Sequence, residues 1–179
     1  PTLILFRRQR QMCIRDSLTT QAQLRKMAKL GLCANFFTNH IWYWGDQHYD
    51  ITVGPERANA LEPCASALRE GVPFSIHSDA GVTPLGSLHT MWCAVNRVTP
   101  SGRVLGEAEK ISAYEALRAV TISAAYQLHM DHEIGSLEAG KRADFAILED
   151  DPLSVEPMQI RDIGVWGTVL GGIKYPGAG

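Results

Sequence analysis

Residues 72–82 constrain the fold of this chain more than any other segment, because a short apolar run there ends in a polar, acidic turn. Side chains alternate along a strand, so Phe74 and Ile76 are expected on one face and Asp79 on the other. A carboxylate at the carboxyl end of a strand, between two helices, is typical of the catalytic end of a β/α barrel. The alternative is that Asp79 only caps the next turn or helix, as Asp often does.

Helix and strand patterns alternate on the amino-terminal side of this segment. The predicted order is helix, strand, helix and strand, over residues 19–29, 32–38, 59–70 and 72–76. Short connections between alternating helices and strands favour a parallel sheet with helical crossovers. Residues 39–46 follow the first strand as an aromatic stretch that is too polar and irregular for the core, which predicts a loop.

Two further helices are predicted after residue 82, over residues 85–96 and 112–130. Ser112 and Glu115 have the spacing of a capping box at the start of the second helix. The buried stripe of that helix is expected to hold Leu117, Val120, Ala124 and Leu128.

From residue 133 onward the pattern changes to strands and tight turns. Residues 135–148 predict a strand, a turn and a second strand, and residues 163–175 predict a glycine-punctuated hairpin. The predicted fold class is therefore α/β over residues 18–132, followed by β-strands over residues 133–179. We place a domain boundary near residue 133.

Composition argues against several classes of partner. A formal net charge of -2 disfavours nucleic acid or an anionic membrane. No apolar run approaches the roughly 20 residues that span a bilayer. The four cysteines are widely separated and form no CxxC pair, so free thiols in a reducing compartment, and hence a cytoplasmic location, are expected.

The first 17 residues are expected to lie outside the native protein. The chain begins without Met, and the run from Arg8 to Ser17 is typical of translated sequencing-adaptor sequence. The alternative is a frayed basic tail. Residues 1–17 are therefore interpreted as non-native or disordered and are left out of the predicted fold.

Several motifs, in this order, resemble the C-terminal part of an amidohydrolase-superfamily enzyme. They are Ser78-Asp79 at a strand end, Glu115–Ala125 in a helix, and Gly135–Asp144 before an apolar strand. Residues 39–46 and 168–175 are similar to the branch that includes N-substituted formamide deformylases. The resemblance covers residues 18–175, nearly all of the chain that we interpret as native.

The resemblance implies a (β/α)8 TIM barrel joined to a small β-sandwich. Residues 18–132 would be the C-terminal part of the barrel, and residues 133–179 would be the C-terminal strands of the sandwich. Family members bind one or two divalent metal ions, zinc above all. Of the family's metal ligands only Asp79 has a match here, and the others would lie upstream of this incomplete fragment.

The resemblance also implies hydrolysis of non-peptide, amide-type C–N bonds. Asp79 would be both a metal ligand and the catalytic base that takes a proton from the attacking water. His40 is expected to orient the substrate, unless it is only a surface-loop histidine. His77 is expected to line the barrel beside the substrate as a hydrogen-bonded histidine, and a catalytic role for it is the less favoured alternative. Trp42 is expected to wall the substrate pocket or merely to pack its loop.

Other functions remain open on the same fold. One is a catalytically inactive binding or regulatory protein, and another is a deaminase, because fold and metal site do not determine the substrate. The expected partner is a small-molecule amide-type substrate, and assembly as a homo-oligomer stays open. The fragment alone is expected to be inactive, since a whole barrel needs about 250 residues.

Overall fold

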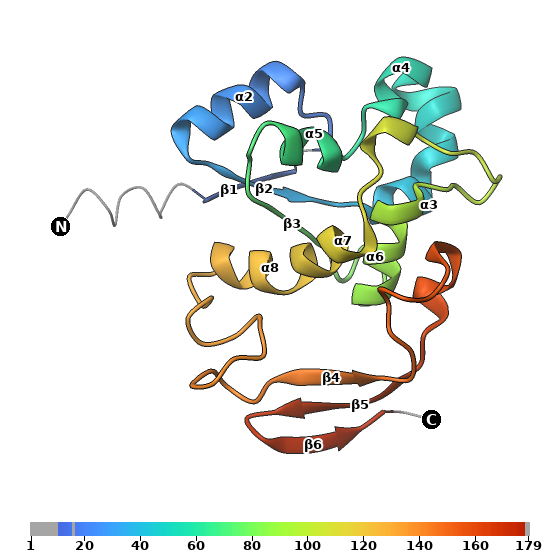
Figure 1. Ribbon diagram of the computed structural model, residues 1–179. Coiled ribbons are helices and arrows are strands. Elements are labelled where there is room, and N and C mark those ends of the chain that lie inside the picture. Colours follow the sequence, from blue (N-terminus) through green and yellow to red (C-terminus); the bar gives the residue numbers. More distant parts are fainter. Residues whose placement is uncertain (1–10, 16, 178–179) are drawn as a thin grey trace.

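The computed structural model describes residues 11–15 and 17–177. In its first half, helices alternate with three strands (Figure 1). The elements are β1 (Gln11–Arg15), α2 (Gln21–Leu30), β2 (Cys33–Phe36), α3 (Asn39–Gln47), a π-helix (His48–Thr52), α4 (Gly54–Asn59), α5 (Cys64–Arg69) and β3 (Phe74–Ile76).

The second half holds further helices and a second group of strands. These are α6 (Ser87–Asn96), α7 (Ala113–Val120), α8 (Ile122–Gln127), β4 (Phe145–Leu148), β5 (Val165–Leu170) and β6 (Ile173–Pro176), with short 3₁₀ turns at Glu107–Glu109 and Pro157–Asp162. In the described part of the chain, no helix combines the length and the apolar character that crossing a membrane requires.

The first three strands form one parallel sheet in the order β1-β2-β3. Ala34 pairs with Phe74 and Phe36 with Ile76, which confirms the predicted parallel pairing of these two segments. Helices α2 and α5 lie on one side of this sheet, and α7 and α8 lie on the other (Figure 1). The expectation that residues 1–17 are non-native remains a prediction: residues 11–15 pair with β2 as β1, and residues 1–10 and 16 lie outside the described residues.

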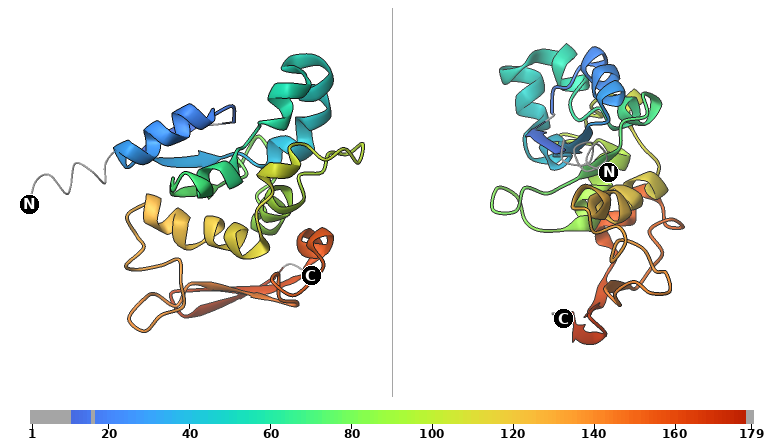
Figure 2. Two further views of the ribbon diagram at one scale, coloured as in Figure 1. Left: turned by 45° about the horizontal axis from the view of Figure 1, so that its top comes forward. Right: turned by 90° about the vertical axis from the view of Figure 1, so that its left-hand side faces the viewer.

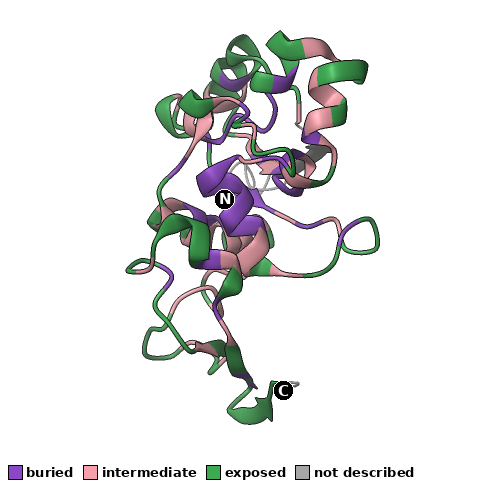
Figure 3. Ribbon diagram, turned by 90° about the vertical axis from the view of Figure 1, so that its right-hand side faces the viewer, coloured by how far each residue is buried: buried purple, intermediate pink, exposed green. Residues whose placement is uncertain are grey.

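The last three strands form an antiparallel sheet in the order β4-β5-β6. Its β5–β6 hairpin, which turns at Gly171 and Gly172 with positive φ, confirms the predicted hairpin. Helices α7 and α8 lie between the two sheets (Figures 1 and 2). Buried residues gather in the α/β part, whereas every residue of β6 is exposed (Figure 3).

The predicted loop over residues 39–46 is wrong, because this segment forms α3. Asn39, Ile41 and Gly45 of that helix are buried. A Cβ atom on Gly45 would lie 2.7 Å from the Thr99 side chain, so the helix sits directly against the chain that follows α6. This tertiary packing favours a helix despite the polar, aromatic composition.

Two long predicted helices are each divided. Of the helix expected over 59–70, Asn59 lies at the end of α4 and residues 64–69 form α5, while residues 60–63 between them are not helical. The helix expected over 112–130 breaks at Thr121, whose φ and ψ of -119° and -97° are not helical. The predicted stripe is only partly buried: Leu117 and Val120 pack against the core, and Leu128 is exposed. The buried residues of α7 and α8 are Ala116, Ala119 and Ala125.

The strand predicted at the start of residues 135–148 is also absent from the structure, in which only Phe145–Leu148 is a strand. Gly135 has φ of +91°, and a Cβ atom there would lie 2.7 Å from Ala125. The Ser136 hydroxyl donates to Glu138 and accepts from Lys141, at 2.5 Å each. These local hydrogen bonds favour a turn over an extended strand.

Candidate functional site

The predicted site residues lie where β2 and β3 end. Helix α3, which carries His40, begins three residues after β2, and His77 directly follows β3. The His77 N–H donates to the carbonyl of Phe36 at 3.0 Å and so continues the strand pairing to this end. Because the two strands are parallel, their carboxyl ends meet at one edge of the sheet. In β/α barrels this edge carries the active site.

An aromatic stack brings two of the predicted residues together. The ring of Phe37 lies 5.2 Å from the ring of His77, nearly parallel to it at 18°. The same Phe37 ring lies 4.3 Å from the ring of His40. His40 and His77 are therefore both packed against the residue that follows β2.

Asp79 is held in a turn immediately beyond β3. Its backbone has φ of 49°, in the left-handed region that non-glycine residues rarely adopt. Its N–H donates to Nδ1 of His77 at 3.1 Å, and its carbonyl accepts from the N–H of Val82 at 2.8 Å. Such a conformation costs about 1–3 kcal/mol and persists where the surroundings impose it. The residue as a whole is half-buried.

The sequence analysis did not identify Glu62 as part of this site. This glutamate is 0% exposed, and its Oε1 lies 3.0 Å from Nδ1 of His40. Its Oε2 accepts the N–H of Phe37 at 3.0 Å. The signal in the sequence is a charged residue between Leu61 and Pro63, in an otherwise apolar run.

A further histidine lies beside His40 on the π-helix. The rings of His40 and His48 are 5.5 Å apart, and Nδ1 of His48 lies 2.7 Å from the Thr52 hydroxyl. Burial lowers the pKa of His48. Single π-helical turns are frequent at functional sites.

Trp42 occupies a different environment from His40 and His77. Its ring lies 5.2 Å from the ring of Trp92 on α6, and the guanidinium of Arg161 lies 4.9 Å from its centre. These contacts tie α3 to α6 and to the 3₁₀ turn at Pro157–Asp162. A substrate contact by Trp42 stays a prediction, while its packing role is visible.

The described residues alone do not complete a metal site. None of them form a group of three or more His, Cys, Asp or Glu side chains that could hold a metal ion. Catalytic zinc takes about three protein ligands and keeps one open position. The described residues therefore offer one candidate ligand for such a site, the Asp79 carboxylate.

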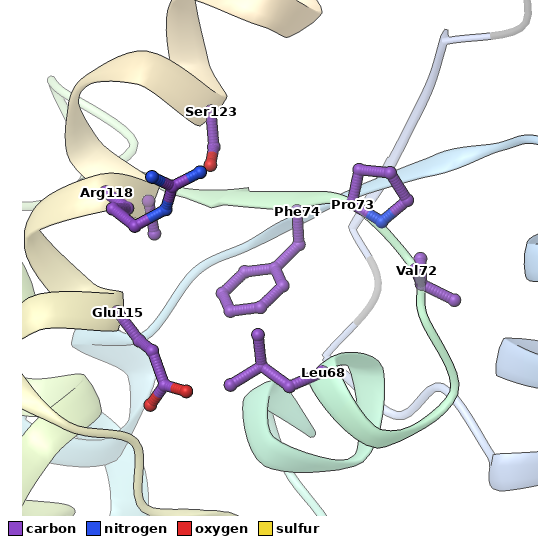
Figure 4. A pocket seen from close by; sticks show the side chains of 8 residues that line it. Leu68, Val72, Pro73, Phe74, Glu115, Arg118 and Ser123 are labelled. Carbon is purple, nitrogen blue, oxygen red and sulfur yellow. The ribbon is translucent and has the colours of Figure 1, made fainter. Parts of the chain in front are cut away.

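Two cavities lie away from the candidate site. One, of about 220 Å³, lies at the amino end of β3 between α5 and α7, and Leu68, Phe74 and Arg118 contribute to its walls (Figure 4). The other, of about 620 Å³, lies between α7–α8 and the chain around β4, and Leu117 and Leu128 of the predicted stripe line it. In barrels the amino end of the strands serves stability, so we do not assign catalysis to the first cavity.

Comparison with known proteins gives consistent matches. The sequence profile of the Amidohydrolase family matches residues 5–173. The N-substituted formamide deformylase of Arthrobacter pascens is 33% identical over 152 residues, which are 84% of this chain and 28% of that protein. This chain thus spans between a quarter and a third of the length of that relative.

Solved structures agree with this match. An uncharacterized metal-dependent hydrolase from Pyrococcus furiosus superposes with a TM-score of 0.65 at 26% identity, over 78% of this chain and 28% of that chain. An adenosine deaminase from Xanthomonas campestris with bound zinc has a TM-score of 0.62 at 20% identity, over 88% of this chain and 35% of that chain. The second likeness shows the fold alone, a TIM-barrel-related α/β fold.

Proposed function

This chain belongs to the amidohydrolase family, and we propose that it is part of a metal-dependent hydrolase acting on non-peptide, amide-type C–N bonds. The observation that carries the proposal is the parallel pairing of β2 with β3, which sets Asp79, His40 and His77 at the carboxyl edge of one sheet. The deformylase from Arthrobacter pascens supports amide-type substrates. The substrate of this protein would be a small molecule.

The proposed roles follow from the positions of the side chains. Asp79 takes a proton from the attacking water and returns it to the departing nitrogen. His40 and His77, which both pack against Phe37, bind and orient the substrate. Trp42 would form a wall of the substrate pocket, although its ring also packs against Trp92.

A divalent metal, with zinc as the first candidate, belongs to this proposal, because a zinc-bound adenosine deaminase shares the fold. When bound, such a metal lowers the pKa of a water ligand to about 7. Asp79 would supply one of its ligands. The other ligands would come from parts of the protein that precede residue 18. The proposed site holds one or two ions, and elemental analysis of the full-length protein measures their number.

The proposed domain organisation follows the two sheets. Residues 18–132 would form the C-terminal part of a (β/α)8 barrel, and residues 133–179 would form the C-terminal strands of a β-sandwich. The parallel β1-β2-β3 sheet supports the first assignment and the antiparallel β4-β5-β6 sheet supports the second. The free thiols of Cys33, Cys64 and Cys93 favour a cytoplasmic location. Homo-oligomer formation is left to measurement.

The test is the substitution Asp79→Asn in the full-length protein that carries this sequence. With formamides, N-acyl amines and cyclic imides as substrates, we expect kcat/KM to fall by about 10²–10⁴-fold, the usual contribution of a general base. The matched control is Asp162→Asn, which changes an exposed carboxylate that pairs with Arg161. Wild-type kcat/KM and wild-type metal content in Asp79→Asn would contradict the proposed roles.

The same panel separates the alternative functions. Amino-substituted purines are included as deaminase substrates, and release of ammonia from these alone would favour a deaminase on the same fold. A metal-loaded, folded full-length protein that turns over none of these compounds would favour a binding or regulatory protein.

A further inference from the structure

We propose that Glu62 is a positioning residue that holds His40 in the tautomer with its proton on Nδ1, and so presents Nε2 as the ring atom that meets substrate or metal. The proposal rests on the proposed function of the same site. It assigns a role to a residue that the sequence motifs do not include.

The first support is the burial of the Glu62 carboxylate. It has no exposed surface, and its two oxygens have different partners: Oε1 faces Nδ1 of His40, and Oε2 accepts the N–H of Phe37, each at 3.0 Å. A carboxylate buried without partners would be strongly destabilising. The carboxylate therefore links the His40 ring to the backbone of Phe37, whose ring the His40 ring contacts.

The second support is the backbone that carries this carboxylate. Glu62 has φ of 48°, a left-handed conformation that is unfavourable for a residue with a side chain. Buried Arg97 holds the turn, because its guanidinium donates to the carbonyl of Glu62 at 3.0 Å and also to the carbonyl of Leu61. Strained residues of this kind cluster at functional sites where surrounding contacts impose them.

The tautomer follows from the partners of Nδ1. Besides Glu62, the Ser17 hydroxyl lies 3.0 Å from Nδ1 of His40. An ionised carboxylate only accepts hydrogen bonds, whereas a hydroxyl can also accept. A proton on Nδ1 is donated to the carboxylate, and the Ser17 hydroxyl can share it as a second acceptor, while a bare Nδ1 would put its lone pair against the buried carboxylate. Nε2 of a neutral His40 ring then carries a lone pair, as in carboxylate–histidine–metal arrangements.

His77, which also packs against Phe37, has the opposite tautomer. Its Nδ1 accepts the backbone N–H of Asp79 at 3.1 Å, so the neutral ring carries its proton on Nε2. The two histidines that contact Phe37 thus differ in tautomer: the neutral His40 ring has a lone pair on Nε2, and the neutral His77 ring has its proton on Nε2.

The first experiment reads the tautomer of His40 directly by NMR. The full-length protein is labelled with ¹⁵N at its histidines, and the His40 signals are identified by their loss in His40→Gln. We expect the wild-type protein to carry the proton on Nδ1, and Glu62→Gln to lose this preference. A wild-type ring with its proton on Nε2 would overturn the proposal, and this result does not depend on whether the Glu62 variant folds.

The second experiment is a double-mutant cycle in the same protein. If Glu62 acts through His40, Glu62→Gln lowers kcat/KM about 10–100-fold, the usual cost of removing the partner of a ligating histidine. The same substitution then has no further effect in a His40→Ala background. The matched control is Glu70→Gln, which removes the partly exposed carboxylate that pairs with Arg25. Equal and additive losses in both backgrounds would overturn the proposal.

The two experiments separate this inference from the proposed function. If the panel of substrates shows no turnover but His40 changes tautomer in Glu62→Gln, the positioning role stands and the hydrolase assignment falls. If hydrolysis is observed and the tautomer does not respond to Glu62→Gln, the hydrolase assignment stands and the positioning role falls.

Discussion

At the scale of single residues, backbone strain concentrates at the candidate site and its support. Among the described residues, the non-glycine positions with positive φ are Glu62, Asp79, Arg97 and His129. The Glu62 carboxylate faces His40, the backbone N–H of Asp79 donates to His77, and Arg97 holds the backbone of Glu62. Three strained residues in one network indicate that surrounding contacts, and not local preference, determine the site geometry.

The cysteines allow a prediction about thiol reactivity. Burial raises the pKa of Cys93 to about 12 and raises that of Cys64 further, while Cys33 is only half-buried. The thiolate is the reactive form. Under native conditions at pH 8 we therefore expect iodoacetamide to modify Cys33 at least about tenfold faster than Cys64 or Cys93. Mass spectrometry of digested samples measures this, and equal rates for Cys33 and Cys93 would contradict the burial described here.

At the scale of elements, helix starts follow local chemistry while helix extents follow packing. Thr20 caps α2 together with Gln23, and Ser112 caps α7 together with Glu115, as the residue types predict. Helix α3 has no side-chain cap, and its polar, aromatic composition is no guide to its structure. It is helical because Ile41 packs in a small buried cluster with Ala58, Leu61 and Leu105.

The cap of α7 can be tested by the substitution Ser112→Ala. The Ser112 hydroxyl accepts the N–H of Glu115 at 3.2 Å, and the Glu115 carboxylate accepts the N–H of Ser112 at 2.8 Å. Removing the hydroxyl should lower the free energy of unfolding by about 1 kcal/mol. Denaturant titration of the full-length protein measures this. Ser87→Ala, at the exposed first position of α6, is the control, and an equal effect of the two substitutions would argue against the cap.

At the scale of the whole molecule, the described chain has two open sheets, and each edge strand is paired on one side only. The parallel sheet has β1 and β3 at its edges, and the antiparallel sheet has β4 and β6. Parallel sheets are normally buried on both faces and continue into further strands. Trp166, Leu170 and Ile173 of the β5–β6 hairpin are between 57% and 61% exposed. These features fit a chain that spans about 28% of a longer relative.

The isolated 179-residue polypeptide is therefore expected to aggregate. Open strand edges and exposed apolar side chains favour pairing between copies. We expect it in the insoluble fraction on expression, and refolded material should bind no more zinc than its Asp79→Asn variant. Sedimentation and elemental analysis measure the two quantities. A soluble monomer with one zinc ion per chain would contradict the expectation.

Much of the fold could be predicted from the sequence, because the relevant interactions lie within a few residues. Strand alternation and apolar runs located β2 and β3, a capping box located the start of α7, and paired glycines located the β5–β6 hairpin. The same local signals placed Asp79 directly after a strand. The family resemblance then gave that carboxylate a chemical role.

Only the tertiary structure decided which groups meet at the site. Glu62 and His40 are 22 positions apart in the chain, and no local pattern indicates that their side chains are 3.0 Å apart. The helical state of α3 and the left-handed backbone of Glu62 likewise depend on contacts with distant residues, Leu105 and Arg97 among them. Hydrogen bonding within a few residues is encoded in short patterns, whereas the pairing of buried charges depends on the complete packing of the molecule.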